Sequence, residues 1–409
     1  MPDKLRIAVV SPFLDRRHGT ERCVLEQVVR LARDPDWALH LYAQQVEDLK
    51  TVRFTEGARE QQAGAIYWHR VSAIRGPHLL QFGWWYFANR FARRRDTRSG
   101  RLRFDLVYSP GINCSDADAI CVHACFSALE EHLRSAPTAG AAGLGSFARR
   151  LHRRLYYGLL ASLERRIYTR RRTALAAVSH RTARELERRF QRGDVHIIPN
   201  AVDPGAFHPA ERIARRPAGR EKMGYGETDF VLLLIGNDWR MKGLPALLEA
   251  AARCRELPLR LLVAGEDDPR PYVRWACELG IGERVRFVAP SADTLDFYAA
   301  ADAYVAPSLE DSFNLPVLEA MACGLPVVVS TRAGVSEWIQ DGVNGVSLQT
   351  PDDPGEISAM LKKLAENPAW RSCLGEHAAS TAKMLSWERN LSELRAWLES
   401  CARTRQSAR

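Results

Sequence analysis

Short apolar runs alternate with amphipathic segments along the whole chain. In the first half, the pattern predicts buried strands at 5–13, 39–45, 65–71, 104–110, 118–125, 173–179 and 196–209, with helices at 18–34, 147–172 and 180–190. A second series follows a proline-rich connection, with strands at 230–238 and 259–267, a helix at 242–254 and further alternation beyond. Two series of this kind predict an α/β protein with two doubly wound, Rossmann-like domains. We expect domains at 1–208 and 209–384 and a last helix within 385–409.

Length and composition agree with two domains of ordinary size. The chain has 409 residues, and 46% of them are hydrophobic. No run of eighteen apolar residues occurs, and the first thirteen residues resemble a strand more than a signal peptide. The nine cysteines are an odd number without a second pair at metal-ligand spacing, which favours free thiols in a reducing, cytoplasmic compartment.

The positive charge is concentrated in the first half of the chain. Residues 1–205 carry 34 Lys and Arg against 21 Asp and Glu, whereas the remainder is mildly acidic. Arginines cluster in 88–103 and 147–172, next to the aromatic residues of 78–95 and 153–160. Arginine with Trp and Tyr suits an anionic membrane surface, although a core helix with a solvated basic face would look alike. We expect membrane docking through 78–103 and 147–172, and no nucleic-acid partner because no such motif is present.

The segment 308–324 carries the most specific chemistry. It places Glu310, Asp311 and Glu319 around a Phe-Asn-Leu-Pro turn that opens a helix at about Pro316. Unpaired N–H groups and the dipole at a helix start attract anions, and nearby carboxylates accept hydrogen bonds from hydroxyls. A phosphate flanked by polyols describes a nucleotide sugar. The alternative is an acidic first turn that only complements the helix dipole.

This segment resembles the double-glutamate motif of the family-four retaining glycosyltransferases, which have the GT-B fold. The two acids of that motif, eight positions apart, match Asp311 and Glu319, with Asp in place of the first Glu. Asn314 replaces a glycine of the motif and still tolerates the left-handed conformation. The resemblance implies that Glu310 or Asp311 meets the hydroxyls of the donor sugar and that Glu319 holds the ribose. It also implies that the turn residues Phe313, Asn314 and Leu315 belong to the donor site.

A basic loop at 236–244 follows the first strand of the second series. Arg240 and Lys242 are cations at a helix start, where they would stabilise a diphosphate leaving group. The family has an Arg and a Lys in this loop, and their close spacing here is similar to that of lipopolysaccharide-core members. The alternative is a solvated basic turn.

Two features of the first half complete the resemblance. The loop 11–22 resembles the glycine loop of the family, and Gly19 there would let the backbone approach a ligand on the acceptor side. His123 follows a strand where the family places a histidine near the donor sugar; the alternative is a core histidine. Asp116, Asp118 and the acids of 266–268 are interpreted as loop acids, so no metal or other cofactor is expected.

The resemblance implies a GT-B fold in which two Rossmann-like domains face a cleft and the last helix crosses back to the first domain. We expect a retaining, metal-independent hexosyltransferase whose donor is a nucleotide-diphosphate sugar, with a UDP-sugar favoured. The expected acceptor is a lipid-linked glycan or a polysaccharide or lipopolysaccharide precursor at the inner membrane face. Alternatives are an epimerase or an enzyme with a small soluble acceptor, and a non-catalytic scaffold that binds sugar nucleotides.

Overall fold

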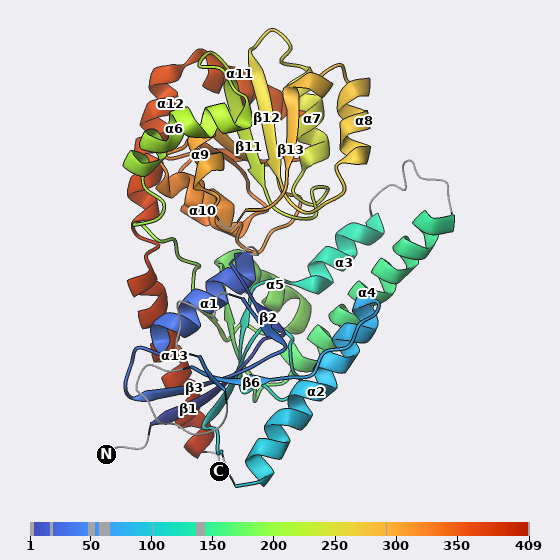
Figure 1. Ribbon diagram of the computed structural model, residues 1–409, viewed down its shortest axis with the longest axis vertical. Helices are drawn as coiled ribbons and strands as arrows, with labels where there is room; N and C mark the ends of the chain where they lie inside the picture. The colour runs from blue at the N-terminus through green and yellow to red at the C-terminus, as the bar shows by residue number, and fades with distance from the viewer. Residues whose placement is uncertain are drawn as a thin grey trace. The chain divides into compact units, whose positions relative to one another are not determined.

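The chain folds into two compact units, each built on one parallel sheet (Figure 1). The computed structural model describes residues 4–16, 19–47, 54–56, 66–100, 102–135, 144–291 and 293–407, without the side chains of 54–56, 132–135, 144–151 and 153. Unit 1 contains the chain up to Ile198 and from Leu391 onward, and unit 2 is Pro199–Asn390. The predicted architecture of two Rossmann-like α/β domains is therefore confirmed.

Unit 1 has a sheet with the strand order β10-β9-β8-β7-β1-β3-β6-β5 among its described residues, and neighbouring strands in it are parallel. The strands of unit 1 are β1 (Leu5–Val10), β2 (Phe13–Leu14), β3 (Trp37–Ala43), β4 (Gln45–Val46), β5 (Phe54–Glu56), β6 (Ile66–Arg70), β7 (Leu106–Pro110), β8 (Ala119–Val122), β9 (Ala174–Ala177) and β10 (Val195–Ile197). Its helices are α1 (Gly19–Leu31), α2 (His78–Arg98), α3 (Phe126–Ser135), α4 (Leu144–Tyr168), α5 (His180–Phe190) and most of α13 (Trp387–Ser407). The small strands β2 and β4 pair with each other outside the main sheet.

The core of unit 1 lies between the sheet and the long helices. Ile120 and Leu175 of the sheet belong to the same buried cluster as Trp85 of α2 and Leu160 of α4. The central strands are buried along their whole length, as expected for a parallel sheet covered on both faces. This packing fixes the inward faces of α2 and α4 against the sheet.

The last helix packs on unit 1, as predicted. The ring of Trp397 on α13 meets the ring of Tyr108 on β7 edge to face, with centroids 6.4 Å apart. Arg395 forms an ion pair with Asp34 after α1. Further along the helix, Arg405 pairs with Asp118. The helix is therefore held to unit 1 along most of its length.

Unit 2 has a sheet with the strand order β13-β12-β11-β14-β15-β16. Its strands are β11 (Phe230–Ile235), β12 (Leu259–Ala264), β13 (Val285–Val288), β14 (Ala303–Ala306), β15 (Val327–Ser330) and β16 (Val346–Leu348). Its helices are α6 (Pro209–Met223), α7 (Leu244–Ala252), α8 (Arg270–Glu278), α9 (Leu295–Ala300), α10 (Leu315–Ala322), α11 (Pro354–Glu366) and α12 (Pro368–Ala382), with 3-10 turns at Gly282–Arg284 and Gly334–Trp338. The order of strands and helices reproduces the predicted alternation.

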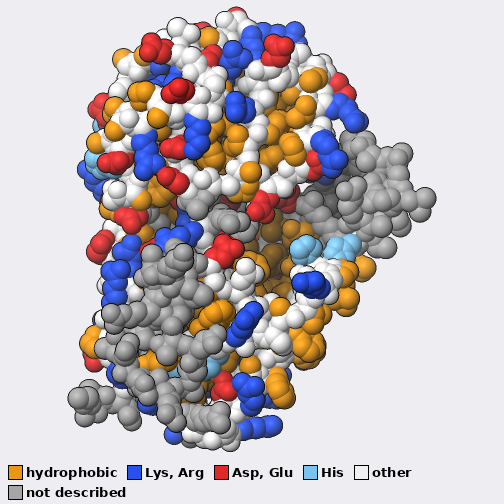
Figure 2. All heavy atoms as spheres, viewed as in Figure 1, with side chains coloured by type: hydrophobic (Ala, Val, Ile, Leu, Met, Phe, Trp, Pro, Cys, Tyr) orange, Lys and Arg blue, Asp and Glu red, His pale blue; other side chains and the backbone are white. Residues whose placement is uncertain are grey.

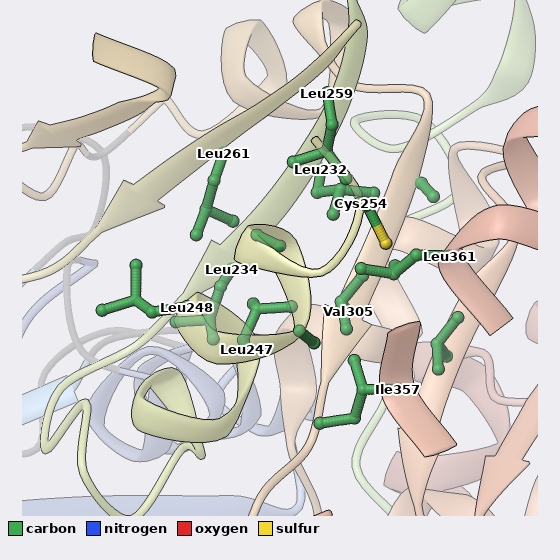
Figure 3. Close-up of a cluster of buried hydrophobic side chains, with 14 of the residues drawn as sticks. Leu232, Leu234, Leu247, Leu248, Cys254, Leu259, Leu261, Val305, Ile357 and Leu361 are labelled. Atoms are coloured by element: carbon green, nitrogen blue, oxygen red, sulfur yellow. The ribbon is translucent and has the colours of Figure 1, made fainter. Parts of the chain in front are cut away.

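Helices α7 and α11 cover one face of the unit 2 sheet. Leu232 and Leu234 of β11 pack in one buried cluster with Leu247 of α7 and Ile357 of α11 (Figure 3). The apolar run of α7 is buried along most of its length because strands and α11 enclose it. A rigid base of this kind positions the loops at the ends of the strands.

The segment 196–209 differs from the prediction of a strand. Only Val195–Ile197 pairs with β9, and the chain then continues without regular structure until α6 begins at Pro209. His208 caps α6, because its Nδ1 accepts a hydrogen bond from the backbone N–H of Ala210 at 3.1 Å. A proline at the first helical position is compatible with a helix. Pro209, which was interpreted as part of a connection, is therefore the first residue of α6.

Candidate functional site

The basic loop and the acidic loop of unit 2 follow two neighbouring strands. β11 and β14 are hydrogen-bonded in parallel, and the loops 236–243 and 307–314 leave their carboxyl ends. Each loop ends at the start of a helix, α7 and α10 respectively. The parallel arrangement brings both loops to the same edge of the sheet, which is where ligands of such sheets bind.

The two loops are in backbone contact. Leu309 donates its N–H to the carbonyl oxygen of Met241 at 2.8 Å. Gly243 has a φ of +79°, and a Cβ there would lie 1.9 Å from the carbonyl oxygen of Pro307. A side chain at this position is thus excluded both by the backbone conformation and by the approach of the second loop. The glycine after Lys242 keeps the loops close enough for their side chains to meet.

Lys242 and Asp311 form an ion pair between the two loops. The Nζ atom of Lys242 lies 2.5 Å from Oδ2 of Asp311, and both side chains are largely buried. The other carboxylate oxygen of Asp311 accepts the N–H of Phe313 at 3.2 Å, which fixes the orientation of the acid. The structure therefore brings together one member of the predicted cation pair and one member of the predicted acid pair.

The other two predicted charged residues of the loops, Arg240 and Glu310, are neighbours of this pair in sequence. Arg240 is exposed and lies two positions before Lys242, and Glu310 is half-buried and directly precedes Asp311. Asp267 fixes the backbone of the basic loop, because its Oδ2 accepts a hydrogen bond from the N–H of Trp239 at 2.5 Å. The Trp239 ring is buried against Phe287, with centroids 5.1 Å apart.

The turn before α10 adopts the conformation that the sequence predicts. Asn314 has a φ of 73°, in the left-handed region that asparagine was expected to tolerate. Its side-chain amide donates to Oγ of Ser308 at 3.2 Å. The side chains of Phe313 and Leu315 are buried, so these two residues offer a ligand their backbone rather than their side chains.

Glu319 is a buried acid in an otherwise apolar helix. Only 3% of the residue is exposed, and its Oε2 accepts a hydrogen bond from the hydroxyl of Tyr298 at 2.7 Å. Burying a carboxylate requires partners that compensate for the lost water. Tyr298 lies on α9, outside both motifs, and no sequence signal pointed to it. Burial raises the pKa of Tyr304, and the negative charges of Asp311 and Glu319 add to this effect.

The acids set aside as loop residues have structural partners. Asp116 accepts a bidentate pair of hydrogen bonds from Arg93, at 2.7 and 3.2 Å. Asp118 accepts the N–H of Val107 at 2.8 Å. In the part of the chain that the structure describes, no group of three or more His, Cys, Asp or Glu has the geometry of a metal site.

Unit 1 contains a cavity where the acceptor-side residues were predicted. Its volume is about 640 Å³, and its lining includes Ser11, Thr20, Gln81, Trp85 and His123. Gly19, just before Thr20, is the first residue of α1, and a Cβ there would meet no atom within 4 Å. The glycine loop and His123, distant in sequence, thus lie around the same part of unit 1.

His123 is a neutral, buried imidazole at the wall of this cavity. Burial lowers the pKa of His123 to about 4, because the charged form would lose its water. Among the described residues no atom makes a hydrogen bond to its Nε2. A buried ring nitrogen of this kind is suited to a hydrogen bond with a bound molecule.

The fold and the paired loops define a protein of the GT-B class. Residues 17–206 match the family model described as Glycosyltransferase Family 4, and residues 229–367 match the one described as Glycosyl transferases group 1. The chain therefore belongs to the family-four, group 1 glycosyltransferases, as its motifs indicated.

Curated relatives are about one third identical to this chain over roughly half of its length. A D-inositol 3-phosphate glycosyltransferase of Catenulispora acidiphila is 33% identical over 216 residues, which are 49% of this chain and 50% of the relative. A protein of the same name from Geodermatophilus obscurus is 35% identical over 212 residues, or 48% of this chain and 45% of the relative. The chain spans about half the length of these relatives.

Solved structures with the same fold cover nearly the whole chain. WaaG, a glycosyltransferase involved in lipopolysaccharide biosynthesis, has a TM-score of 0.74 at 20% identity and covers 95% of this chain and 98% of its own. Sucrose-phosphate synthase from Thermosynechococcus elongatus has a TM-score of 0.73 at 19% identity and covers 97% and 99%. At these identities the likeness establishes the fold. No described helix is both long and apolar enough to cross a bilayer.

Proposed function

We propose that this chain is a retaining, metal-independent glycosyltransferase that moves a hexose from a nucleotide-diphosphate sugar to a lipid-linked glycan or a polysaccharide or lipopolysaccharide precursor. The observation that carries the proposal is the contact of Lys242 with Asp311 at the ends of two adjacent strands. The sugar–phosphate bond of such a donor has an anion on one side and hydroxyls on the other. A cation and a carboxylate side by side match both groups.

Each residue of the pair has a role in this proposal. Lys242 and the exposed Arg240 neutralise the diphosphate, and their fixed charges perform the work that a metal ion would otherwise do. Asp311, with Glu310 beside it, accepts hydrogen bonds from the hexose hydroxyls. Glu319 accepts those of the ribose, with Tyr298 holding the carboxylate in place.

The reaction proceeds by attack on the same face as the leaving group. The acceptor hydroxyl oxygen bonds to the anomeric carbon while the bond from that carbon to the phosphate oxygen breaks. The leaving phosphate oxygen takes the acceptor proton, so a glycoside and a nucleoside diphosphate are formed with the anomeric configuration retained. No protein nucleophile is needed, and neutral His123 contributes a hydrogen bond rather than a base.

The proposed donor is a UDP-sugar, and we propose that the reaction takes place at the inner face of the membrane. Structures of HepE from Anabaena, which share the fold at about 19% identity, contain UDP or UDP-glucose. The basic, aromatic helices of unit 1 suit a lipid-linked acceptor.

A small phosphorylated acceptor is the second candidate. The relatives named as D-inositol 3-phosphate glycosyltransferases favour it, and Arg70 in the cavity of unit 1 offers a cation for a phosphate. If the wild type transfers the sugar to inositol phosphate and the Arg70→Gln variant does not, the small phosphorylated acceptor is favoured over the lipid-linked one. An epimerase would convert the donor without releasing nucleoside diphosphate.

Donor hydrolysis tests the proposal. Incubation with UDP-glucose in the absence of acceptor should release UDP and glucose slowly, with and without EDTA. The anomer released first, observed by NMR, should have the configuration of the donor. A protein that binds the donor but never releases UDP would be the non-catalytic scaffold, and EDTA-sensitive release would contradict metal independence.

A further inference from the structure

The helix α2 (His78–Arg98) has two chemically opposite faces. Leu80, Trp84, Phe87 and Phe91 are spaced by four, three and four residues, so they form one stripe along the helix. The residues buried against unit 1, including Trp85 and Asn89, lie on the other side. The apolar stripe therefore faces outward.

The stripe is unusually exposed. Phe87 is 75% and Phe91 72% exposed, whereas Leu80 is 60% and Trp84 43% exposed. Trp84 is held in place because its indole N–H donates to the carbonyl oxygen of Ser72 at 2.9 Å. Single exposed apolar residues are ordinary, but a row of large ones marks an interaction surface. We name these four residues the α2 stripe.

Arginines continue the same face of the helix. Arg94, Arg95 and Arg98 follow Phe91 at the spacing of the stripe, and all three are exposed. The only acid in the sequence of α2, Asp96, is buried, where it accepts the hydroxyl of Tyr42 at 2.8 Å. Figure 2 shows hydrophobic and basic side chains together on the side of unit 1 along which α2 runs. Asp96 also forms an ion pair with Arg95 at 3.4 Å, so the outward face of the helix is apolar and cationic, with the charge of one of its three arginines partly compensated.

The neighbouring helix α4 (Leu144–Tyr168) has the same character. It runs beside α2 (Figure 1), and the rings of Phe82 and Tyr156 meet edge to face with centroids 6.1 Å apart. Leu155 and Leu159 are exposed on it, as are several arginines. Its only acid, Glu164, is fully buried. Arg101 and the side chains of 147–151 and 153, which belong to the predicted basic segments, lie outside the described residues.

We propose that the α2 stripe inserts into the headgroup layer of an anionic bilayer, with Arg94, Arg95 and Arg98 on lipid phosphates. Large apolar residues beside arginines are the composition of helices that lie in a membrane interface. A second copy of this chain fits poorly, because an isologous contact would pair two faces that are both cationic. An anionic bilayer can bury the apolar side chains of the α2 stripe and bind the arginines through its phosphates.

Docking would also place the cavity of unit 1 at the membrane. Gln81, Phe82 and Trp85 of α2 line that cavity from the inward side of the helix. One helix thus separates the bilayer from the proposed acceptor site by its own width, about 10 Å. This consequence rests on the proposed function, whereas the docking itself does not.

Vesicle flotation tests the docking without any substrate. The full chain should float with vesicles of phosphatidylcholine containing about one third phosphatidylglycerol and not with phosphatidylcholine alone. Phe87→Ser combined with Phe91→Ser should lower the partition coefficient at least about tenfold. Arg94→Gln, Arg95→Gln and Arg98→Gln together should remove the preference for the anionic lipid. The matched control is Ile213→Ser with Val273→Ser, two exposed apolar residues of unit 2, which should bind as the wild type does.

Each outcome is decisive. Circular dichroism and the melting temperature should be unchanged in the Phe variant, since both side chains are exposed, and donor hydrolysis should persist. Binding that survives the Phe substitutions, or the absence of binding by the wild type, would overturn the proposal. A dimer in sedimentation velocity that the Phe substitutions dissociate would assign the stripe to a second copy instead. Loss of donor hydrolysis with intact flotation would contradict the proposed function but not the docking.

Discussion

Lys242 and Asp311 are 69 positions apart in sequence, yet Nζ and Oδ2 are separated by 2.5 Å. The contact exists because β11 and β14 are neighbours and because Gly243 lets the two loops meet. A partly buried pair of this kind is sensitive to loss of either partner, since the remaining charge is left in a poorly solvated place. Substitution of either residue is therefore expected to have a large effect.

A double-mutant cycle on this pair should show strong coupling. Lys242→Met and Asp311→Asn should each lower kcat/KM for the donor by about 100-fold, or about 2.7 kcal/mol, because each removes a charge next to the breaking bond. The double variant should lose much less than the product of the two effects. The measurement is donor hydrolysis at several donor concentrations.

The control for this cycle is another lysine–acid pair of unit 2. Lys362 lies 2.7 Å from Glu256 on the surface, where ion pairs contribute little. Lys362→Met should leave kcat/KM within about twofold of the wild type. If the loss of kcat/KM in the double variant equals the product of the losses in Lys242→Met and Asp311→Asn, the two residues do not act on the same ligand.

Tyr298→Phe should weaken donor binding through Glu319. The substitution removes the hydroxyl that donates to the buried carboxylate at 2.7 Å, a loss of about 1 kcal/mol in net hydrogen-bond energy. KM for the donor should rise about fivefold with kcat little changed, because the ribose contact is equally strong in the ground and transition states. Glu319→Ala, which removes the carboxylate itself, should raise KM further, again with kcat little changed.

Tyr225→Phe supplies the comparison for Tyr298→Phe. Its hydroxyl is buried and has no hydrogen-bond partner among the residues that the structure describes. This variant should retain the KM of the wild type. A fall in kcat with unchanged KM in Tyr298→Phe would contradict the role assigned to Glu319.

Glu164 should make the protein less stable as the pH rises. Burial raises the pKa of Glu164 to about 7, although its carboxylate accepts hydrogen bonds from the N–H groups of Phe126 and Ser127. The native state then holds the proton more tightly than the unfolded state, so this contribution is complete below about pH 4.5 and is lost as the pH rises through about 7. At about 1.4 kcal/mol per pH unit, the loss is on the order of 3 kcal/mol.

Glu164→Gln should remove that dependence. The difference in unfolding free energy between variant and wild type, measured with urea from pH 4.5 to 8, should shift in favour of the variant as the pH rises. Glu187→Gln on the exposed side of α5 serves as the control. A constant difference across this range would show that Glu164 is ionised throughout.

His123 should have the opposite effect on stability. Its lowered pKa, about 4, means that the unfolded state binds the proton more readily, so stability is lost as the pH falls from about 6.5 towards 4. His123→Gln should lose less stability over that interval. The NMR signals of His123 should not titrate between about pH 5.5 and 8, and a midpoint near 6.5 would contradict its neutral, buried state.

The local parts of the site were visible in the sequence. Lys242 before Gly243, and Asp311 eight positions before Glu319, are short-range patterns whose loop conformations depend on nearby residues. Asn314 is a similar case, because few residues other than glycine tolerate its backbone conformation. Helix α5 also begins and ends where its periodicity predicted, at His180 and Phe190, with Ser179 as its cap.

The long-range parts were not visible. The hydroxyl of Tyr298 on α9 meets Glu319 on α10, and a tyrosine on a short apolar helix has no pattern that distinguishes it from core. Helix α6 was hidden because Pro209 indicates a connection as readily as a first helical position. The outward direction of Phe87 and Phe91 likewise depends on which face of α2 meets the sheet. Periodicity could not decide this because the helix has large apolar residues on both sides.

Nucleotide binding to the wild type and to Lys242→Met tests the central claim most directly. In a thermal-shift panel of UDP, GDP, ADP and their glucose conjugates, one nucleotide and its sugar should stabilise the wild type by roughly 2.7 kcal/mol at 100-fold the dissociation constant. Most of that stabilisation should disappear in Lys242→Met and persist in Lys362→Met. A panel in which no nucleotide stabilises the wild type, or in which Lys242→Met responds as the wild type does, would contradict the claim that these loops bind a nucleotide-diphosphate sugar.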